Sequence, residues 1–405
     1  MVFGPNSLRG WLRGHRTKGD LLAQRTIGVI GASRKDGDLR RPIHPRHLNR
    51  IDEDLRGALT FEHGYGEHFG VDDAEISAAG VSVASRAALI GDCDVILLPK
   101  PVHADIAELR QGQVLWGWPH CVQDPVMTQM AVDQRLTLIA WEAMNHWNAD
   151  GTFALHVFHK NNELAGYASV LHALSLGGRT GHYGPRVKAA VLSFGATARG
   201  AVTALEGLGV FDVTVLTQRD TTAVAAPSPG LLFGQFERTE EDPSSTVALR
   251  RSGPQPTARY LAEFDIVVNC VLQDVEAPLM FVRNDDLEHF APGALFVDVS
   301  CDEGMGFEFA RPTSFAEPIF EVGNGAHYYG VDHSPSYLWN AATWEISEAL
   351  LPYLRTVIDG PDAWDSDPTV HRAIEIRDGV VVNPAILSFQ GRAAEYPHPQ
   401  DASAM

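Results

Sequence analysis

The stretch that decides the fold is VKAAVLSFGATARGAVTALEGLGVFDVTVLTQR, residues 187–219. Its first apolar run, residues 187–192, predicts a buried parallel strand, and its second, residues 213–216, predicts another. Between them lie a turn of small residues and a helical pattern that continues to residue 205. A strand, a tight turn, a helix and a second strand within about thirty residues are typical of the βαβ unit that binds a dinucleotide.

The turn of this unit matches the dinucleotide fingerprint only loosely. The usual Gly-x-Gly-x-x-Gly is Ser193-x-Gly195-x-x-Ala198 here, so only the middle glycine is present. Small residues still let the backbone approach a pyrophosphate at the helix N-terminus. Taken alone, the stretch is equally compatible with an ordinary strand-to-helix turn. The cofactor contacts that it predicts are Ser193, Gly195, Ala196, Thr197 and Ala198.

Length, charge and cysteine content restrict the class of protein. A chain of 405 residues can bury two ordinary cores, so we expect two domains. The formal net charge of −19 argues against nucleic acid or an anionic membrane as a partner, because both require a basic face. The four cysteines are widely spaced without a Cys-x-x-Cys pair, and no metal site is expected. With neither a signal-peptide core nor a membrane-length apolar stretch, we expect a cytoplasmic protein.

Strands alternating with helices along the chain predict an α/β fold with two Rossmann-like, doubly wound parallel sheets and a cleft between them. We expect a substrate domain of residues 26–161 plus 337–395 and a dinucleotide-binding domain of residues 162–336. Helical patterns at residues 162–176 and 337–357 would connect the two. Residues 1–25 are interpreted as an extension or an oligomer contact, residues 225–256 as an irregular insertion, and residues 396–405 as a disordered tail.

Four polar residues, Arg40, Lys100, His120 and Asp302, follow predicted strands at the edge where open α/β sheets bind ligands. Each also has a plainer interpretation. Arg40 suits a solvated loop, Lys100 an exposed turn between two prolines, and His120 a buried core position. Asp302 suits a turn or a helix cap. Together, a guanidinium for a carboxylate, a desolvated lysine for a carbonyl and a histidine for protons suit reduction of an imine made from a 2-oxo acid.

The chain resembles the alanine dehydrogenase/transhydrogenase family over nearly its whole length. The resemblance is carried by RKDGDLRRPIHP (34–45), LLPKP (97–101), LRQGQVLWGWPH (109–120) and PGALFVDVSCD (292–302). It implies that Arg40 holds the pyruvate carboxylate and that Lys100 contacts the substrate oxygen or carboxylate. It also implies that His120 is the catalytic histidine and Asp302 the active-site aspartate.

Other segments depart from alanine dehydrogenase and resemble the carboxyethylornithine synthase branch and, more distantly, the lysine-forming saccharopine dehydrogenases. They are WGWPHCVQ (116–123), VNCVLQD (268–274), VDHSPS (331–336), WEISE (344–348) and ILSFQGR (386–392). Such enzymes join pyruvate to the amine of an amino acid rather than to ammonia. The resemblance makes Asp332 and His333 candidates for contacting that amino acid, although a helix-cap role is equally open. It adds Val271 and Leu272 to the expected cofactor contacts.

The second strand of the dinucleotide unit ends in Thr217-Gln218-Arg219, which are further expected cofactor contacts. Alanine dehydrogenases end this strand with an aspartate that binds the adenosine ribose. Its replacement removes repulsion of a 2′-phosphate, and Arg219 could pair with that phosphate, which favours NADP over NAD. The alternative is that Arg219 is merely a surface charge.

The resemblance therefore implies an opine-type, NADPH-dependent oxidoreductase. Its substrates would be pyruvate or another 2-oxo acid and an ornithine-like amino acid, and we expect a homo-oligomer. One alternative is an alanine dehydrogenase that uses ammonia and NADH. Another is a non-catalytic nucleotide-binding or transhydrogenase-like module.

Overall fold

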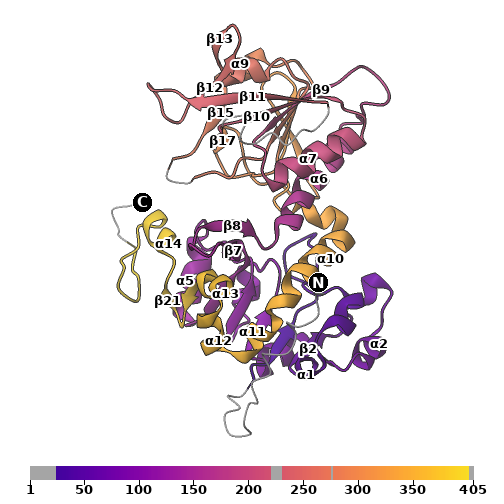
Figure 1. Ribbon diagram of the computed structural model, residues 1–405, viewed down its shortest axis with the longest axis vertical. Coiled ribbons are helices and arrows are strands. Elements are labelled where there is room, and N and C mark those ends of the chain that lie inside the picture. Colours follow the sequence, from indigo (N-terminus) through magenta and orange to yellow (C-terminus); the bar gives the residue numbers. More distant parts are fainter. Residues whose placement is uncertain (1–23, 220–229, 275–276, 401–405) are drawn as a thin grey trace, which may run out of the picture.

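The protein is described by a computed structural model for residues 24–219, 230–274 and 277–400. Within these ranges the chain forms two lobes, each built on one mainly parallel β-sheet (Figure 1). Helices α6 (His159–Leu176) and α10 (Trp339–Leu350) lie where the lobes meet. The two-sheet α/β architecture predicted from the sequence is confirmed.

The first lobe contains an eight-stranded sheet in the order β21-β20-β6-β5-β4-β1-β2-β3 among the described residues. Strands β1 to β6 run parallel, and β20 joins antiparallel to β6. The strands are continuously apolar because both faces of the sheet are buried. In β4, for example, Val95 and Leu97 belong to the hydrophobic cluster on one face, and Ile96 belongs to the cluster on the opposite face. The strands are β1 (Ile27–Val29), β2 (Leu59–Glu62), β3 (Ser82–Ala84), β4 (Val95–Leu97), β5 (Val114–Gly117), β6 (Thr137–Ala140), β20 (Ile374–Arg377) and β21 (Val380–Val381).

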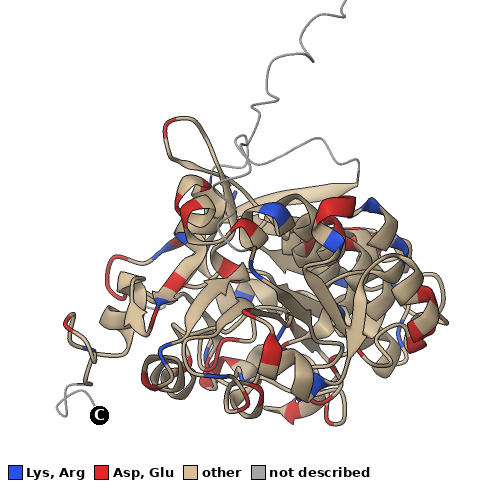
Figure 2. Cartoon of the chain, turned by 90° about the horizontal axis from the view of Figure 1, so that it is seen from below, with Lys and Arg blue, Asp and Glu red and all other residues tan. Residues whose placement is uncertain are grey.

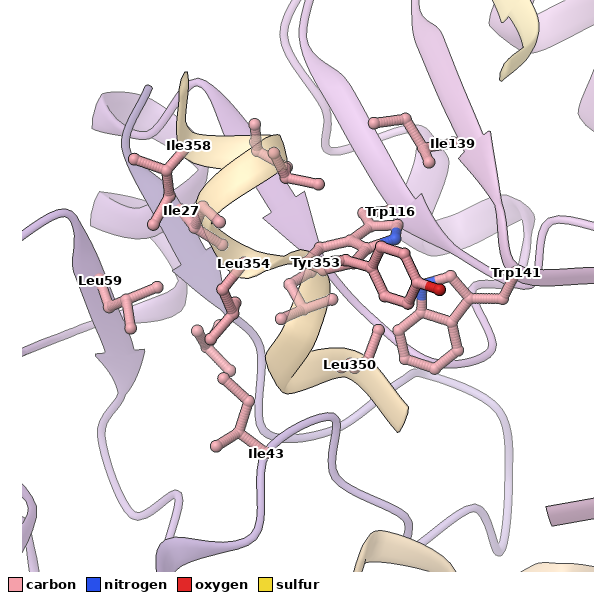
Figure 3. Close-up of a cluster of buried hydrophobic side chains, with 14 of the residues drawn as sticks. Ile27, Ile43, Leu59, Trp116, Ile139, Trp141, Leu350, Tyr353, Leu354 and Ile358 are labelled. Atoms are coloured by element: carbon pink, nitrogen blue, oxygen red, sulfur yellow. The ribbon is translucent and has the colours of Figure 1, made fainter. Parts of the chain in front are cut away.

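One face of this sheet is covered by the end of the chain. Figure 3 shows Tyr353 beside Trp116 and Trp141 and Leu354 on the side of Ile27, and these residues and Leu350 belong to one hydrophobic cluster. The predicted helix over residues 337–357 is divided into α10, the 3-10 turn η6 (Leu351–Tyr353) and α11 (Leu354–Asp359). The remaining helical segments of the lobe are η1 (Pro45–Arg50), α1 (Glu53–Arg56), η2 (Glu67–Phe69), α2 (Asp73–Ala78), α3 (Arg86–Asp92), α4 (His103–Ile106), α5 (Pro125–Asp133), η3 (Trp141–Ala143), α12 (Pro361–Ser366), α13 (Pro368–Ala373) and α14 (Pro384–Phe389).

The second lobe contains a nine-stranded sheet in the order β13-β12-β11-β10-β9-β14-β16-β19-β18 within the described ranges. The predicted βαβ unit forms its centre, with β9 (Lys188–Leu192), α7 (Ala196–Gly207) and β10 (Asp212–Thr217). The other strands and helical segments of the lobe are β11 (Leu231–Arg238), β12 (Thr246–Arg250), β13 (Gly253–Pro256), α9 (Thr257–Leu261), β14 (Ile266–Asn269), β15 (Met280–Val282), η4 (Asp285–His289), β16 (Leu295–Asp298), β17 (Gly306–Phe307), β18 (Ile319–Val322), β19 (Ala326–Tyr329) and η5 (Ser334–Leu338).

Two sequence-based expectations need correction. The irregular insertion expected at residues 225–256 contains three strands within its described residues, 230–256. Strand β11 pairs parallel with β10, and β12 and β13 follow as an antiparallel ribbon. The turn-rich composition of the insertion reflects the short ribbon connections rather than an absence of strands. The tail expected to be disordered from residue 396 has a defined conformation as far as residue 400, where Gln400 forms a β-bridge with Arg392, and residues 401–405 lie outside the described residues. His398 is fully buried, and its Nε2 accepts the N–H of Val381 at 3.0 Å.

Helices α6 and α7 cross closely because each has a glycine at the contact. A Cβ on Gly166 would lie 1.9 Å from the carbonyl oxygen of Thr197, and one on Gly200 would lie 1.7 Å from that of Glu163. This contact holds the helix that leaves the first lobe against the helix that follows the predicted dinucleotide turn. The βαβ unit is thereby fixed relative to α6.

The surface is acidic overall, with acidic and basic residues interspersed along the chain (Figure 2). None of the helices in the described part of the chain combines the length and apolar character needed to cross a membrane. In the same part of the chain, no group of three or more His, Cys, Asp and Glu side chains is arranged to hold a metal ion.

Candidate active site

A cavity of about 520 Å³ lies between the lobes and is lined by residues of both. It gathers four of the residues predicted from the sequence, namely Lys100, His120, Asp302 and Asp332. Lys100 comes three residues after β4, and His120 comes three residues after the neighbouring parallel strand β5. Asp302 and Asp332 follow β16 and β19 at the facing edge of the other sheet. The cavity is therefore the cleft expected at the carboxyl ends of the strands.

The loops that carry Lys100 and His120 are held together by backbone contacts. The N–H of Trp118 donates to the carbonyl of Pro99 at 2.8 Å. A Cβ on Gly117 would lie only 1.9 Å from the carbonyl oxygen of Leu98, so the tryptophan-glycine-tryptophan sequence needs its glycine here. The close approach places the two candidate catalytic side chains next to each other.

A buried aspartate, Asp105, ties the loop after β1 to the loop after β4. Its side chain is 2% exposed and accepts the N–H groups of Val102 at 2.8 Å and Arg34 at 3.2 Å. Arg86 pairs with it at 2.6 Å and balances its charge. As a result, Lys35 and Lys100 line the same cavity.

Lys100 bridges the two lobes. Its Nζ donates to the carbonyl oxygen of Asp332 at 3.0 Å and to the carboxylate of the same residue at 3.2 Å. Burial lowers the pKa of Lys100, and the charge of Asp332 opposes that effect without cancelling it. A lysine in this state can donate to a substrate oxygen and release its proton more readily than a solvated one.

His120 is held by its backbone and presents its ring to the cavity. It has a φ of 52°, which is uncommon for a residue other than glycine, and its N–H donates to Oε1 of Glu142 at 2.7 Å. The side chain is 46% exposed. The surrounding protein and the charge of Lys100 nevertheless lower the pKa of His120 below its usual range. A neutral imidazole at physiological pH can accept a proton.

Behind His120 lies a pair of carboxyl groups that the sequence reasoning missed, the half-buried Glu142 and the buried Glu375. Oε2 of each is buried without a hydrogen-bond partner among the described residues. Burial and their mutual repulsion raise the pKa of Glu142, and burial raises that of Glu375 to about 7. Two adjacent carboxyl groups in this state retain at least one proton near neutrality. Glu142 could have been considered from the sequence because it lies two residues after the buried strand β6. The same position, just after a buried strand, identified Lys100 and His120.

Arg40 lies outside the cavity lining. Its Nε and Nη2 donate to the two carboxylate oxygens of Asp38 at 2.9 and 2.6 Å, and both side chains are almost fully buried. Ser336 donates to the same carboxylate at 2.6 Å. Burial opposes ionisation of Asp38, but Arg40 outweighs it and holds the pKa of that carboxyl well below its usual range. The guanidinium also lies over the ring of Trp118, 5.3 Å from its centroid. The predicted role of Arg40 toward a substrate carboxylate stays a prediction.

The carboxylate of Asp332 is surrounded by the side chains of Lys35, Lys100 and His333. This carboxylate accepts from Lys35 at 2.9 Å as well as from Lys100, and its other oxygen bonds Nδ1 of His333 at 2.7 Å. Burial alone would raise its pKa, but His333 and the two lysines hold the pKa of Asp332 well below its usual range. His333 is 3% exposed, and its Nε2 faces the carbonyl of Asp36 at 3.1 Å. Lys35, absent from the sequence-based site, thus belongs to it.

Asp302 lines the cavity, and its carboxylate accepts no hydrogen bond from any residue that the structure describes. Burial raises its pKa. Four residues earlier, the fully buried Asp298 accepts from Asn269, the N–H of Cys301 and Tyr328 at 3.0 Å each, and burial raises its pKa to about 7. Asp298 anchors the turn, which leaves Asp302 as the carboxyl available to a ligand.

The predicted dinucleotide turn has the geometry of a phosphate-binding site. Ser193 adopts a φ of 81°, a conformation for which the usual glycine is suited. A Cβ added to Gly195 would meet nothing closer than Oγ of Ser193 at 4.0 Å, so space is open in front of the turn. Helix α7 has no side-chain cap, which leaves the N–H groups of its first turn, including those of Ala196 and Thr197, for a ligand. Ala198 is fully buried.

The other predicted cofactor contacts lie at the same edge of the sheet. Thr217 is buried at the end of β10, and its Oγ1 accepts the N–H of Arg219 at 3.2 Å. Gln218 and Arg219 are exposed. After β14, Val271 is buried and Leu272 is 95% exposed. These residues fit a nicotinamide dinucleotide laid across the strand ends of the second lobe, with the turn at its pyrophosphate.

Comparison with known proteins identifies the family of the chain. The profile described as alanine dehydrogenase/PNT, N-terminal domain, matches residues 30–161, and that described as alanine dehydrogenase/PNT, C-terminal domain, matches residues 177–384. A solved structure titled L-alanine dehydrogenase superposes with a TM-score of 0.70 at 22% identity, covering 90% of this chain and 98% of that one.

Two kinds of named relative align along most of the chain. Alanine dehydrogenase of Mycobacterium tuberculosis is 26% identical over 377 residues, which cover 89% of this chain and 96% of that protein. N(5)-(carboxyethyl)ornithine synthase of Clostridium botulinum is 24% identical over 327 residues, which cover 76% of this chain and 90% of that protein. The chain therefore belongs to the alanine dehydrogenase/PNT family of NAD(P)-dependent oxidoreductases acting on amino groups.

Proposed function

We propose that the protein condenses pyruvate with the side-chain amine of an ornithine-like amino acid and reduces the resulting imine with NADPH. The observation that carries this proposal is the meeting of Lys100, His120 and Asp302 in one cavity between the lobes. The volume of about 520 Å³ leaves room for both substrates beside a nicotinamide ring. Similarity to N(5)-(carboxyethyl)ornithine synthase also supports the proposal.

The condensation needs a carbonyl to be polarised and two protons to be moved. Lys100, beside His120, would donate a hydrogen bond to the carbonyl oxygen of pyruvate. The amine nitrogen attacks the carbonyl carbon, and His120, neutral because its pKa is lowered, takes the proton that the nitrogen releases. Lys100 transfers its proton to the carbonyl oxygen, which becomes the hydroxyl of the carbinolamine. The His120 imidazolium then protonates this hydroxyl, which leaves as water and yields the protonated imine.

Asp302 would stabilise the protonated imine, because its carboxylate faces the cavity without a partner among the described residues. When bound, the nicotinamide cofactor supplies the hydride that converts this carbon–nitrogen double bond into a secondary amine. Exclusion of water by the two lobes would protect the imine from hydrolysis.

We propose that Lys35 and Lys100, which line the cavity, bind the 2-oxo acid carboxylate, and that Arg40 assists them from outside the cavity lining. Nε and Nη2 of Arg40 donate to Asp38, and Nη1 has no hydrogen-bond partner among the described residues. Lys35 and Lys100 are the cations that line the cavity itself, and a substrate carboxylate would compete for them with Asp332. In this role Asp332 keeps the two lysines in place before the substrate arrives.

A second candidate is an alanine dehydrogenase reaction, in which ammonia replaces the amino acid and NADH replaces NADPH. It is favoured by the similarity to alanine dehydrogenase of Mycobacterium tuberculosis over 89% of the chain. Turnover of pyruvate with ammonia alone, compared with turnover in the presence of ornithine, distinguishes the two reactions.

Replacement of His120 by alanine separates an enzyme from a module that only binds nucleotide. Loss of the acid–base group should reduce turnover by roughly 100-fold to 10,000-fold, while NADPH binding measured by fluorescence is retained. The exposed His63, which pairs with Asp73 at 3.0 Å, provides the control His63→Ala. If His120→Ala turns over as fast as the native protein, the proposed mechanism is wrong.

A further inference from the structure

One group in the cavity takes no part in the mechanism above: a histidine–aspartate pair, His103 and Asp124. Nε2 of His103 lies 2.7 Å from Oδ2 of Asp124, and both residues line the cavity together with Lys100 and His120. Their side chains are 49% and 33% exposed, so a ligand in the cavity can reach both. Ammonia and pyruvate would leave such a pair without a function.

We propose that His103 and Asp124 form the subsite for the zwitterionic head of the amino-acid substrate, an inference that rests on the proposed function. Asp124 would hold the α-ammonium group. His103, whose Nε2 lies 2.7 Å from Asp124, would contact the α-carboxylate through its Nδ1. Such a subsite selects α-amino acids that react through a side-chain amine, because their charged head lies away from the reacting nitrogen.

The position of the pair along the chain fits this arrangement. His103 comes three residues after Lys100, a separation of at most about 10 Å. Asp124 is one turn from His120, to whose carbonyl its N–H donates at 3.2 Å. In ornithine the reacting nitrogen is separated from Cα by four bonds, a reach of about 5 Å, and a hydrogen bond of about 3 Å at each end extends this to roughly the separation of Lys100 and His103.

The wall between the two ends of the cavity is apolar. Pro101 and Val102 separate Lys100 from His103 in the chain, and both line the cavity, as does Met127. Methylene groups of the substrate side chain would lie against these residues. The adjacent Gln123 also lines the cavity, and its exposed amide forms no hydrogen bond to residues that the structure describes, so it can supply a further donor to the carboxylate.

The subsite is braced by the segment in which the chain departs from alanine dehydrogenase. Nε2 of Gln390 donates to the carbonyls of Cys121 and Val122, and Nη2 of Arg392 donates to that of Pro125 at 3.0 Å. These contacts hold the chain from His120 to the start of α5, where Asp124 caps the helix by accepting the N–H of Met127 at 2.9 Å. The C-terminal segment thus fixes the loop that presents Asp124.

The test uses truncated amines with the full-length protein, pyruvate and NADPH. The probes are ornithine, 5-aminopentanoate (no α-amine), 1,4-diaminobutane (no carboxylate) and butylamine (neither). The variants are Asp124→Asn, which retains a residue able to cap α5, and His103→Gln. The matched control is Asp73→Asn, which alters an exposed aspartate that likewise accepts a backbone N–H and contacts a histidine outside the cavity.

In the native protein kcat/KM should favour ornithine over butylamine by at least 100-fold, since each charge-assisted contact contributes roughly 10-fold or more. Asp124→Asn should reduce mainly the preference over 5-aminopentanoate, and His103→Gln mainly that over 1,4-diaminobutane, each by about 10-fold or more. Asp73→Asn should leave both ratios unchanged.

Two results would overturn the subsite. One is a native protein that uses ornithine and butylamine equally well, and the other is a pair of variants whose ratios equal those of the native protein. In both cases the amine condensation itself would stand. If ammonia alone supports turnover and no organic amine does, the proposed function fails, and the subsite fails with it.

Discussion

Nζ of Lys100 lies 3.0 Å from the carbonyl oxygen of Asp332 and 3.2 Å from its carboxylate, so a lysine of one lobe is bound to an aspartate of the other across the cavity. The contact has an electrostatic consequence. Burial lowers the pKa of Lys100, and the negative charge of Asp332 limits that decrease. The proton affinity of the lysine therefore depends on a residue from the facing lobe.

Asp332→Asn should lower the pKa of Lys100 further, because the neutral amide no longer stabilises the ammonium group. In the pH dependence of kcat/KM for pyruvate, the apparent pKa that reflects ionisation of Lys100 should decrease by about one unit or more. Steady-state rates measured between pH 6 and 10 check this. Asp92→Asn, at an exposed position of α3, is the control. A profile for Asp332→Asn that coincides with that of the native protein would contradict the link.

Gly195→Ala should weaken cofactor binding without destabilising the fold. Gly195 has φ −78° and ψ −166°, which alanine adopts freely, and the nearest atom to an added Cβ is 4.0 Å away. The methyl group would instead enter the space where the pyrophosphate approaches the N-terminus of α7. We expect an increase in the dissociation constant for NADPH of roughly 10-fold or more, measured by calorimetry.

Gly200→Ala is the complementary control for that variant. Its methyl group would meet the carbonyl of Glu163 at 1.7 Å, so α6 and α7 must separate and urea should unfold the protein at lower concentration. If Gly195→Ala were destabilised like Gly200→Ala, or bound NADPH as well as the native protein, the turn would not be the phosphate site.

Glu375→Gln should reduce the loss of stability that the native protein shows as pH rises. The pKa of Glu375 is raised by burial to about 7 in the folded state, from an ordinary value near 4.5. Between these values the folded state binds more protons than the unfolded state, so the free energy of unfolding falls as pH increases from about 5 to about 8. A pKa shift of this size changes the free energy of unfolding by about 3 kcal/mol over this pH range.

Urea titrations at several pH values measure this effect, and the difference between the variant and the native protein isolates it from other titrating groups. Exposed Glu53 supplies the control Glu53→Gln. Parallel pH dependences for Glu375→Gln and the native protein would show that the buried pair does not retain a proton.

Arg219→Ser should reduce the preference for NADPH over NADH by roughly 10-fold to 100-fold, because the exposed side chain at the end of β10 would no longer pair with the 2′-phosphate. KM values for the two cofactors measure the preference. Arg186→Ser removes another exposed arginine, before β9 at the opposite end of the sheet, and should have no effect. If KM for NADPH is unchanged in Arg219→Ser, this arginine is a surface charge without a role in cofactor choice.

The sequence predicted the parts of the fold and site that follow from strand order. Apolar runs located the central strands, and the rule that ligands bind at the carboxyl ends of parallel strands identified Lys100, His120 and Asp302. Glu142 also follows a strand, but nothing in its sequence context distinguishes it from a solvated glutamate. The ribbon of β12 and β13 was missed because β13 has the sequence Gly-Pro-Gln-Pro, which is typical of a turn.

Sequence patterns did not predict the contacts between segments that lie far apart in the chain. Glu375 reaches Glu142 only because β20 returns antiparallel to β6 at the end of the chain. The pairing of Arg40 with Asp38 also could not be inferred, since an arginine near an aspartate in a charged loop is equally compatible with two solvated side chains. Desolvation, which fixes these pairings and the associated pKa shifts, depends on the whole packed structure.

The most direct test of the proposed function is the mass of the product formed from pyruvate, NADPH and ornithine. The protein should consume NADPH in proportion to a product that carries a carboxyethyl group on the side-chain nitrogen of ornithine, as mass spectrometry with fragmentation would show. Formation of alanine as the sole product, from pyruvate and ammonia at an equal rate with or without ornithine, would contradict the proposal.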